Sequence, residues 1–127
     1  MSTRAGIIIK DKYDQIHFYR HSDGYPEGTL PALEKFLSWV KEGKICNNVQ
    51  QSAGWLIVIG AMEYATLPPA PVNTAKYGSN VKIEDIPAPA DWKVGAFEPT
   101  VSVERHGDLE YIYTVDLDKM EITHREA

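Results

Sequence analysis

Cysteine is nearly absent from this sequence of 127 residues, in which Cys46 is the single thiol and no CxxC pair occurs. One cysteine cannot form a disulfide within the chain, and the paired spacing of a structural zinc site is missing. These absences exclude the class of small secreted domains held together by disulfides. We therefore expect a protein of the reducing cytoplasm.

Long hydrophobic runs are absent as well. The longest apolar stretch, residues 55–62, spans eight residues, whereas a transmembrane helix needs about twenty. The apolar run at residues 5–9 is too short for the core of a signal peptide, and no small-residue cleavage site follows it. We therefore expect a soluble protein without a membrane partner.

Basic residues are in deficit, with 13 Lys and Arg against 18 Asp and Glu, which gives a net charge of −5 and a pI near 5.3. Nonspecific binding to DNA or RNA needs a basic surface, so a nucleic-acid partner is not expected. The signatures GxGxxG, GxxxxGK[ST], GxSxG and HExxH are also missing. No residue is therefore assigned a catalytic role.

The composition that is present is typical of a globular protein. Hydrophobic residues make up 43% of the chain and charged residues 24%, both close to the averages for folded domains. At this length we expect residues 1–127 to form one domain, with a core that needs neither metal nor disulfide.

The first half of the chain predicts two strands followed by a helix. Residues 5–10 are rich in β-branched isoleucine, and residues 15–21 alternate between the two faces of a strand, which indicates a hairpin with Ile16 and Phe18 facing inward. An apolar stripe at three- and four-residue spacing then predicts a helix over residues 30–42. Thr29 is its expected N-cap, and Gly43 the residue that ends it.

The second half predicts another helix, a loop and a return to strands. Residues 47–66 read as a helix that begins at Asn47 or Asn48 and is apolar on nearly every side, although Trp55–Ile59 would also suit a strand. Residues 67–92 contain five of the eight prolines and should be irregular. Three strands in a meander are expected at 99–105, 109–116 and 119–124.

These elements predict an α+β fold in the order ββ-α-α-loop-βββ. The sheet is expected to be mostly antiparallel, with the two helices packed on one face.

The most distinctive segment is HSDGYPEG, residues 21–28, which is rich in turn-forming residues and connects a strand to the first helix. It contains a His-x-Asp pair, His21 and Asp23, and a second pair, His106 and Asp108, lies in a later turn. Imidazole and carboxylate groups bind divalent metals and also act as general acids and bases. If both turns lie at the same sheet edge, these four residues form a candidate metal or ligand site.

A protein interface is the other candidate. The second helix exposes apolar side chains on several sides, and surface of that kind is typical of a partner-binding face or a homodimer. An alternative is that the proline-rich loop covers this helix within the same chain. The candidate interface residues are Tyr19, Tyr25, Trp39, Trp55 and Met62.

The segment from Tyr19 to Gly28, following a strand hairpin and preceding an amphipathic helix, resembles uncharacterised small phage and prophage proteins that carry an H-x-D-G-Y-P motif. Residues 106–113, HGDLEYIY, are also similar to theirs. The resemblance implies a viral or prophage origin and the cytoplasm of a bacterial host, and it implies no particular activity.

Three functions follow as hypotheses. The first is a non-enzymatic accessory protein that binds another protein, since small acidic phage proteins include inhibitors of host defence systems. The second is a metal- or anion-dependent small-molecule binder or hydrolase that uses the two His-x-Asp pairs. The third is a component of the virion or of its assembly.

Overall fold

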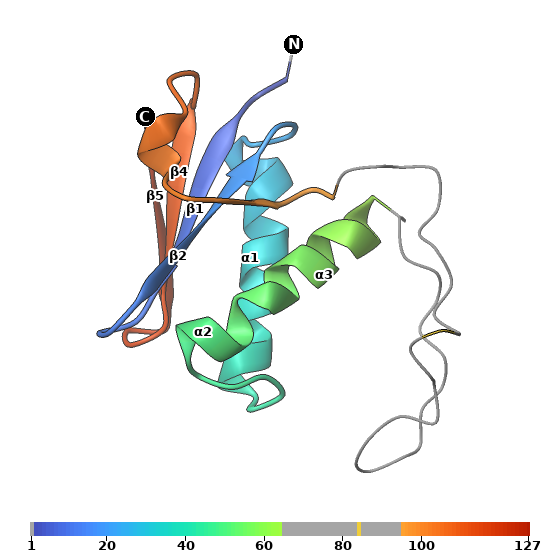
Figure 1. Ribbon diagram of the computed structural model, residues 1–127, viewed down its shortest axis with the longest axis vertical. Helices are drawn as coiled ribbons and strands as arrows, with labels where there is room; N and C mark the ends of the chain where they lie inside the picture. The colour runs from blue at the N-terminus through green and yellow to red at the C-terminus, as the bar shows by residue number, and fades with distance from the viewer. Residues whose placement is uncertain (1, 65–83, 85–94) are drawn as a thin grey trace.

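The computed structural model describes residues 2–64, 84 and 95–127, and its fold is the predicted α+β class (Figure 1). The strands form one five-stranded sheet in the order β3-β2-β1-β4-β5. Three of the neighbouring pairs are antiparallel and β1 with β4 is parallel. The elements are β1 (Ala5–Lys10), β2 (Gln15–Arg20), α1 (Pro26–Lys41), α2 (Val49–Ser52), α3 (Gly54–Glu63), β3 (Glu98–Thr100), the 3₁₀ helix η2 (Val103–Arg105), β4 (Tyr111–Asp116) and β5 (Glu121–Glu126).

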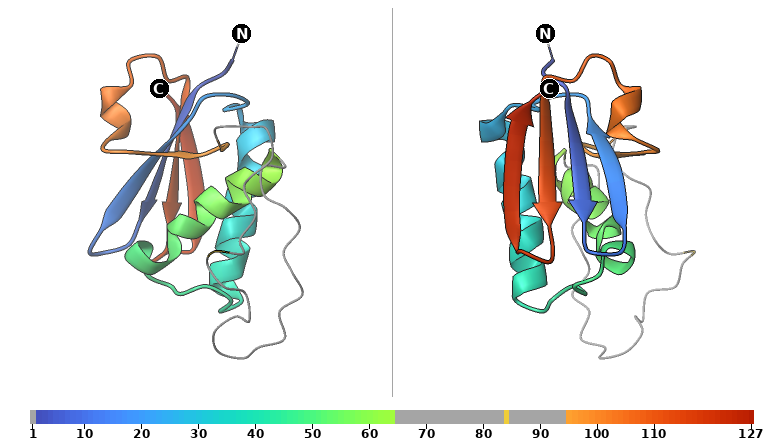
Figure 2. Two further views of the ribbon diagram at one scale, coloured as in Figure 1. Left: turned by 45° about the vertical axis from the view of Figure 1, so that its right-hand side comes forward. Right: turned by 90° about the vertical axis from the view of Figure 1, so that its left-hand side faces the viewer.

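The helices lie on one face of the sheet, and η2, which follows the edge strand β3, lies on the other face (Figures 1 and 2). On the helix face, Ala5, Ile7 and Ile9 of β1 are fully buried, as the alternation of side chains along a strand requires. On the opposite face Val103 of η2 lies against Gly6, where an added Cβ would come within 2.7 Å of a Val103 methyl carbon. Both faces of β1 are therefore covered.

The predicted meander is wrong in its strand order. β3 pairs with β2 at one edge of the sheet, whereas β4 lies in the interior beside β1, so the last three strands are not consecutive neighbours. The predicted strand 99–105 is also divided into β3 and η2. Strand order depends on long-range pairing, which a local alternation pattern does not encode.

Helix α1 ends as predicted but begins earlier. Gly43 has a φ of +73°, and the bonds from Gly43 N–H to the Val40 carbonyl and from Lys44 N–H to the Trp39 carbonyl complete a Schellman motif. The predicted N-cap is wrong, because the helix starts at Pro26 and Thr29 is buried in its first turn. Pro26 fits this start because its missing N–H would have no partner there.

The second predicted helix is present over most of its described part, but it begins at Val49 and is divided into α2 and α3. Asn48 is the N-cap of α2, where its side chain accepts a bond from Gln51 N–H. The division falls at Ala53 beside Gly54, a residue with weak helix propensity. Residues 65–66 and the proline-rich segment 67–92, apart from Glu84, lie outside the described residues. Among the helices that the structure describes, none has the length and apolar character to span a bilayer.

Candidate functional site

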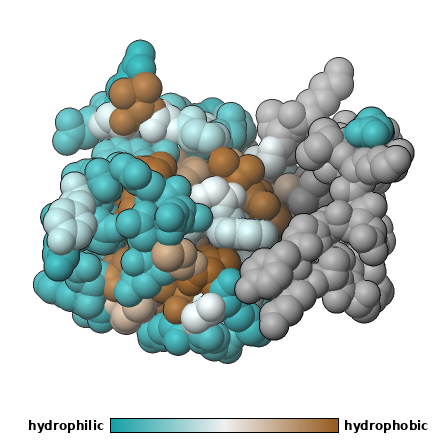
Figure 3. Space-filling model, turned by 60° about the horizontal axis from the view of Figure 1, so that its bottom comes forward, coloured by the Kyte–Doolittle hydropathy of each residue, from teal (hydrophilic) through white to brown (hydrophobic). Residues whose placement is uncertain are grey.

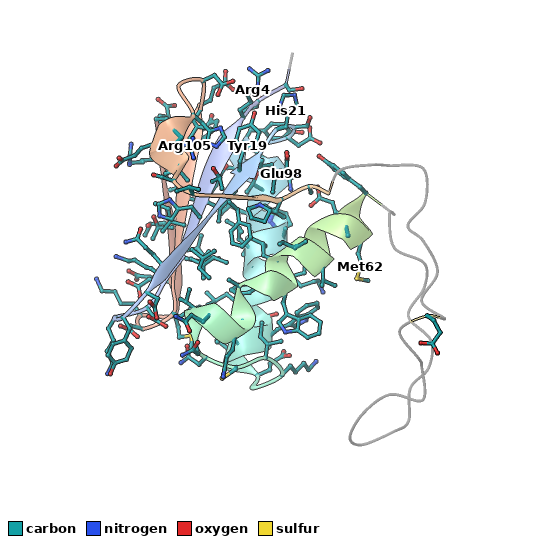
Figure 4. All side chains as sticks on the ribbon, in the orientation of Figure 1. Arg4, Tyr19, His21, Met62, Glu98 and Arg105 are labelled. Carbon is teal, nitrogen blue, oxygen red and sulfur yellow. The ribbon has the colours of Figure 1, made fainter. Side chains whose placement is uncertain are left out.

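The two predicted His-x-Asp turns do meet, at the end of the sheet where β1 begins and β2 ends. Figure 4 shows Arg4, Tyr19 and His21 gathered there. Tyr19 contacts both histidines: its ring stacks on His106 with centroids 4.3 Å apart, and its hydroxyl lies 2.9 Å from Nδ1 of His21. Arg4 joins the second turn through an ion pair with Asp108 at 2.9 Å. We call Arg4, Tyr19, His21, His106 and Asp108 the tyrosine cluster.

Asp23 is the member of the predicted set that lies apart. Its backbone has a φ of +58°, and its carboxylate accepts a hydrogen bond from the Tyr25 hydroxyl at 3.3 Å. In the described residues, no three histidine, cysteine, aspartate or glutamate side chains are placed to hold a metal ion. The geometry therefore brings His21, His106 and Asp108 together without making the predicted four-ligand site.

Within the tyrosine cluster, hydrogen bonds and an ion pair join Tyr19, His21, Arg4 and Asp108, and His106 contributes ring stacking. Nδ1 of His21 also lies 3.4 Å from the donor Nε of Arg4, so this nitrogen acts as an acceptor and the ring proton resides on Nε2. Burial raises the pKa of the Tyr19 hydroxyl, and the charge of Asp108 raises that pKa further. A neutral, hydrogen-bonded tyrosine of this kind fixes the turn at residues 106–108 to the end of β2.

A hollow of about 560 Å³ also adjoins His21. It opens between the turn after β2, the end of α3 and the start of β3. Described residues from these three places line it: His21, Ser22, Asp23, Glu63, Tyr64, Gly95 and Glu98. Its dimensions suit a small molecule.

Arg20 supports this region and was missed by the sequence analysis. Its side chain is 1% exposed, and its guanidinium lies over the Phe97 ring at 4.9 Å. It donates to both carboxylate oxygens of Glu63, at 3.2 and 2.6 Å. It also donates to the carbonyl oxygens of Ser22, Asp23 and Gly28, so one buried charge holds the HSDGYPEG segment against α3.

The HSDGYPEG segment is a closely packed connector. Gly24 N–H donates to the Thr3 carbonyl at 2.9 Å, and the buried Tyr113 hydroxyl donates to the Gly24 carbonyl at 2.6 Å. Thr29 donates its hydroxyl proton to the Asp23 carbonyl at 2.9 Å. Most of the distinctive motif is therefore used to join β2 to α1.

An apolar groove of about 410 Å³ lies between α1 and α3, on the side away from the sheet. Met62, 60% exposed, lines it, and Figure 4 shows this residue far from the tyrosine cluster. Trp39 of α1 lines it too and meets Trp55 of α3 edge-on, with ring centroids 6.5 Å apart. The remaining residues that line it are Pro31, Ala32, Lys35, Ile59 and Glu63.

Two of the five predicted interface residues, Trp39 and Met62, therefore line this groove. Trp55, 45% exposed, contacts Trp39 beside it. Figure 3, in which the bottom of Figure 1 comes forward, shows apolar surface (brown) between areas of polar surface (teal). Tyr19 belongs instead to the tyrosine cluster, and Tyr25 lines a separate hollow with the C-terminal residues of β5.

Comparison of the chain with protein-family models, with curated proteins and with solved structures finds no match.

Proposed function

We propose that this chain is a non-enzymatic accessory protein that acts by binding another protein through the groove between α1 and α3. The observation that carries the proposal is the exposure of Trp55 and Met62, which lie seven positions apart and therefore on the same side of α3. Large apolar side chains gathered on the surface of a folded domain are typical of protein-binding sites.

The chemistry of the groove suits an apolar anchor from a partner. Covering the exposed part of a side chain such as Met62 contributes on the order of 1 kcal/mol, and methionine adapts its shape to the surface it meets. Trp39 and Trp55 add aromatic area, the residue type that dominates binding energy at interfaces. Lys35 and Glu63 at the groove supply polar contacts.

The biological setting of the proposal comes from the sequence motif. The H-x-D-G-Y-P segment resembles small phage and prophage proteins, and proteins of that size and acidic charge include inhibitors that occupy a surface of a host-defence protein. A bacterial host protein is therefore the partner that we propose.

Affinity capture tests this function. The tagged chain, immobilised and exposed to a bacterial host lysate, is expected to retain one host protein in near-stoichiometric amount, which mass spectrometry then identifies. An unrelated acidic protein of the same size, carrying the same tag, is the control. Recovery of the same proteins by both baits would count against the proposal.

A second candidate, small-molecule binding, is favoured by the hollow beside His21. His21, Asp23 and Glu98 give it both donors and acceptors for a polar ligand. Thermal unfolding in the presence of divalent cations and of nucleotides tests this candidate. A ligand that raises the Tm of the wild-type chain but not of His21→Ala would support it, and no shift with any of these compounds would exclude them as ligands.

A further inference from the structure

On the outer face of the sheet, the face opposite the helices, His17 of β2 is hydrogen-bonded to η2. The N–H of Val103 donates to Nδ1 of His17 at 3.0 Å, although the two residues are 86 positions apart. Because a backbone N–H can only donate, Nδ1 must carry a lone pair. The ring is therefore neutral with its proton on Nε2, which lies 2.6 Å from the Gln15 side-chain oxygen.

The contacts of η2 with the outer face of the sheet are separate from the main hydrophobic core. Val103 is 3% exposed and lies over Gly6, yet it does not belong to the main hydrophobic core between sheet and helices. A second histidine supports the same segment, because Nε2 of His106 lies 2.9 Å from the Thr100 hydroxyl. That contact survives protonation, since a hydroxyl oxygen also accepts hydrogen bonds.

The His17 contact does not survive protonation. A proton on Nδ1 would face the N–H of Val103, and two donors cannot bond each other. The neighbours of His17 on the sheet, Ile8 of β1 and Thr100 of β3, carry no charge. Glu104 of η2 is the charged group that acts on the ring, and it favours the protonated form. Burial acts against it and prevails, so that the pKa of His17 is below its ordinary value.

We propose that His17 is an acid-sensitive clasp, and that its protonation releases η2 and Val103 from the outer face of the sheet while the core between sheet and helices stays folded. Release exposes the apolar surface of Gly6, Ile8 and Val103. The surface that the protein presents on this side would therefore change between neutral and mildly acidic conditions.

The direction of the pH effect follows from the pKa of His17 in two states: closed, with η2 bound to the sheet, and open, with η2 released. In the closed state the ring resists protonation, whereas in the open state it titrates near the ordinary value of 6.5. At pH values between the lowered pKa and that ordinary value, release of η2 is therefore accompanied by the binding of one proton to His17. In this range the open population rises as the pH falls, by at most about tenfold for each pH unit.

Amide hydrogen exchange, measured by NMR on the full chain, tests the clasp. The protection factor of the Val103 amide is expected to fall, by at most about tenfold per pH unit, as the pH drops from 6.5 to the lowered pKa of His17, while the amides of Ile7 and Val115 in the core keep theirs. In His17→Asn, the side-chain oxygen replaces Nδ1 as acceptor and cannot be protonated, so Val103 should stay protected.

His124→Asn is the matched control. His124 lies on β5 and contacts the Tyr113 ring, so its replacement removes a histidine without touching η2. This variant should behave as the wild type does. Constant protection of Val103 across the pH range would overturn the proposal. An equal loss in His17→Asn, or a parallel loss at Ile7 and Val115, would overturn it too.

Discussion

Arg20 and Glu63, 43 positions apart in the chain, form a two-point ion pair in which the arginine side chain is 1% exposed. Because the same guanidinium donates to three carbonyl oxygens of the β2–α1 connector, this single side chain positions the HSDGYPEG segment and the end of α3 together. The hollow beside His21 and the groove between α1 and α3 share Glu63 as a lining residue. Both candidate sites therefore depend on Arg20.

Replacing Arg20 tests that dependence. Arg20→Met should lower the free energy of unfolding by about 3 kcal/mol or more, because it removes a buried charge-assisted network and leaves the Glu63 carboxylate and the Ser22 carbonyl without their donor. Urea denaturation followed by circular dichroism measures the change. Lys35→Met removes an exposed positive charge from α1 and should change stability by less than about 0.5 kcal/mol. Equal stability of the two variants would show that Arg20 is not the anchor.

Gly24 is expected to tolerate no side chain. A Cβ at this position would lie 2.7 Å from the Thr3 carbonyl oxygen and 2.8 Å from the Ala5 Cβ, so Gly24→Ala should destabilise the fold by roughly 1–3 kcal/mol. Gly107→Ala is the control, because a Cβ there meets nothing within 4 Å. The urea concentration at the midpoint of unfolding is measured for both variants and should be lower for Gly24→Ala. Equal midpoints would contradict the close packing at Gly24.

Tyr113 should make the fold sensitive to alkali. Burial raises the pKa of its hydroxyl to about 12, whereas an exposed tyrosine titrates near 10. The unfolded chain therefore loses this proton first, and stability falls as the pH rises from about 10 towards 12. Tyr113→Phe should lack this part of the decline.

Tyr113→Phe should also be less stable than the wild type at neutral pH. Without the Tyr113 hydroxyl the buried Gly24 carbonyl loses its donor, which should lower stability by about 1–3 kcal/mol at pH 7. Urea unfolding of both proteins at pH 7 and at several pH values above 9 measures the two effects. Parallel alkaline declines in the wild type and in Tyr113→Phe would contradict the assignment to Tyr113.

The features that sequence predicted well are local ones. Gly43 ends α1 and Asn48 begins α2 because the backbone geometry at a helix end selects those residue types. The first hairpin follows from a period-two pattern, which reports the two faces of a strand directly. Predictions of this kind need only a few neighbouring residues.

The features that sequence did not predict depend on distant contacts. The interior position of β4 arises from pairing with β1 across the whole chain, which no short pattern contains. The meeting of His21 with the turn at His106 was predicted only on the condition that both turns lie at one sheet edge, and that condition depends on the same arrangement. The burial of Arg20 had a usable signal, since the alternation that turns Phe18 inward places Arg20 on the same face, but its partner Glu63 lies in another element.

Protein binding through the α1–α3 groove is the central claim, and a charge placed in the groove tests it most directly. The measurement is the amount of the host protein retained per mole of immobilised bait, by the wild type, Met62→Glu and Val101→Glu. Met62 and Val101 are 60% and 80% exposed, so neither change should disturb folding, and only Met62 lines the groove. We expect Met62→Glu to weaken binding at least tenfold, about 1.4 kcal/mol, and Val101→Glu to bind as the wild type does. Full retention by Met62→Glu would contradict the claim.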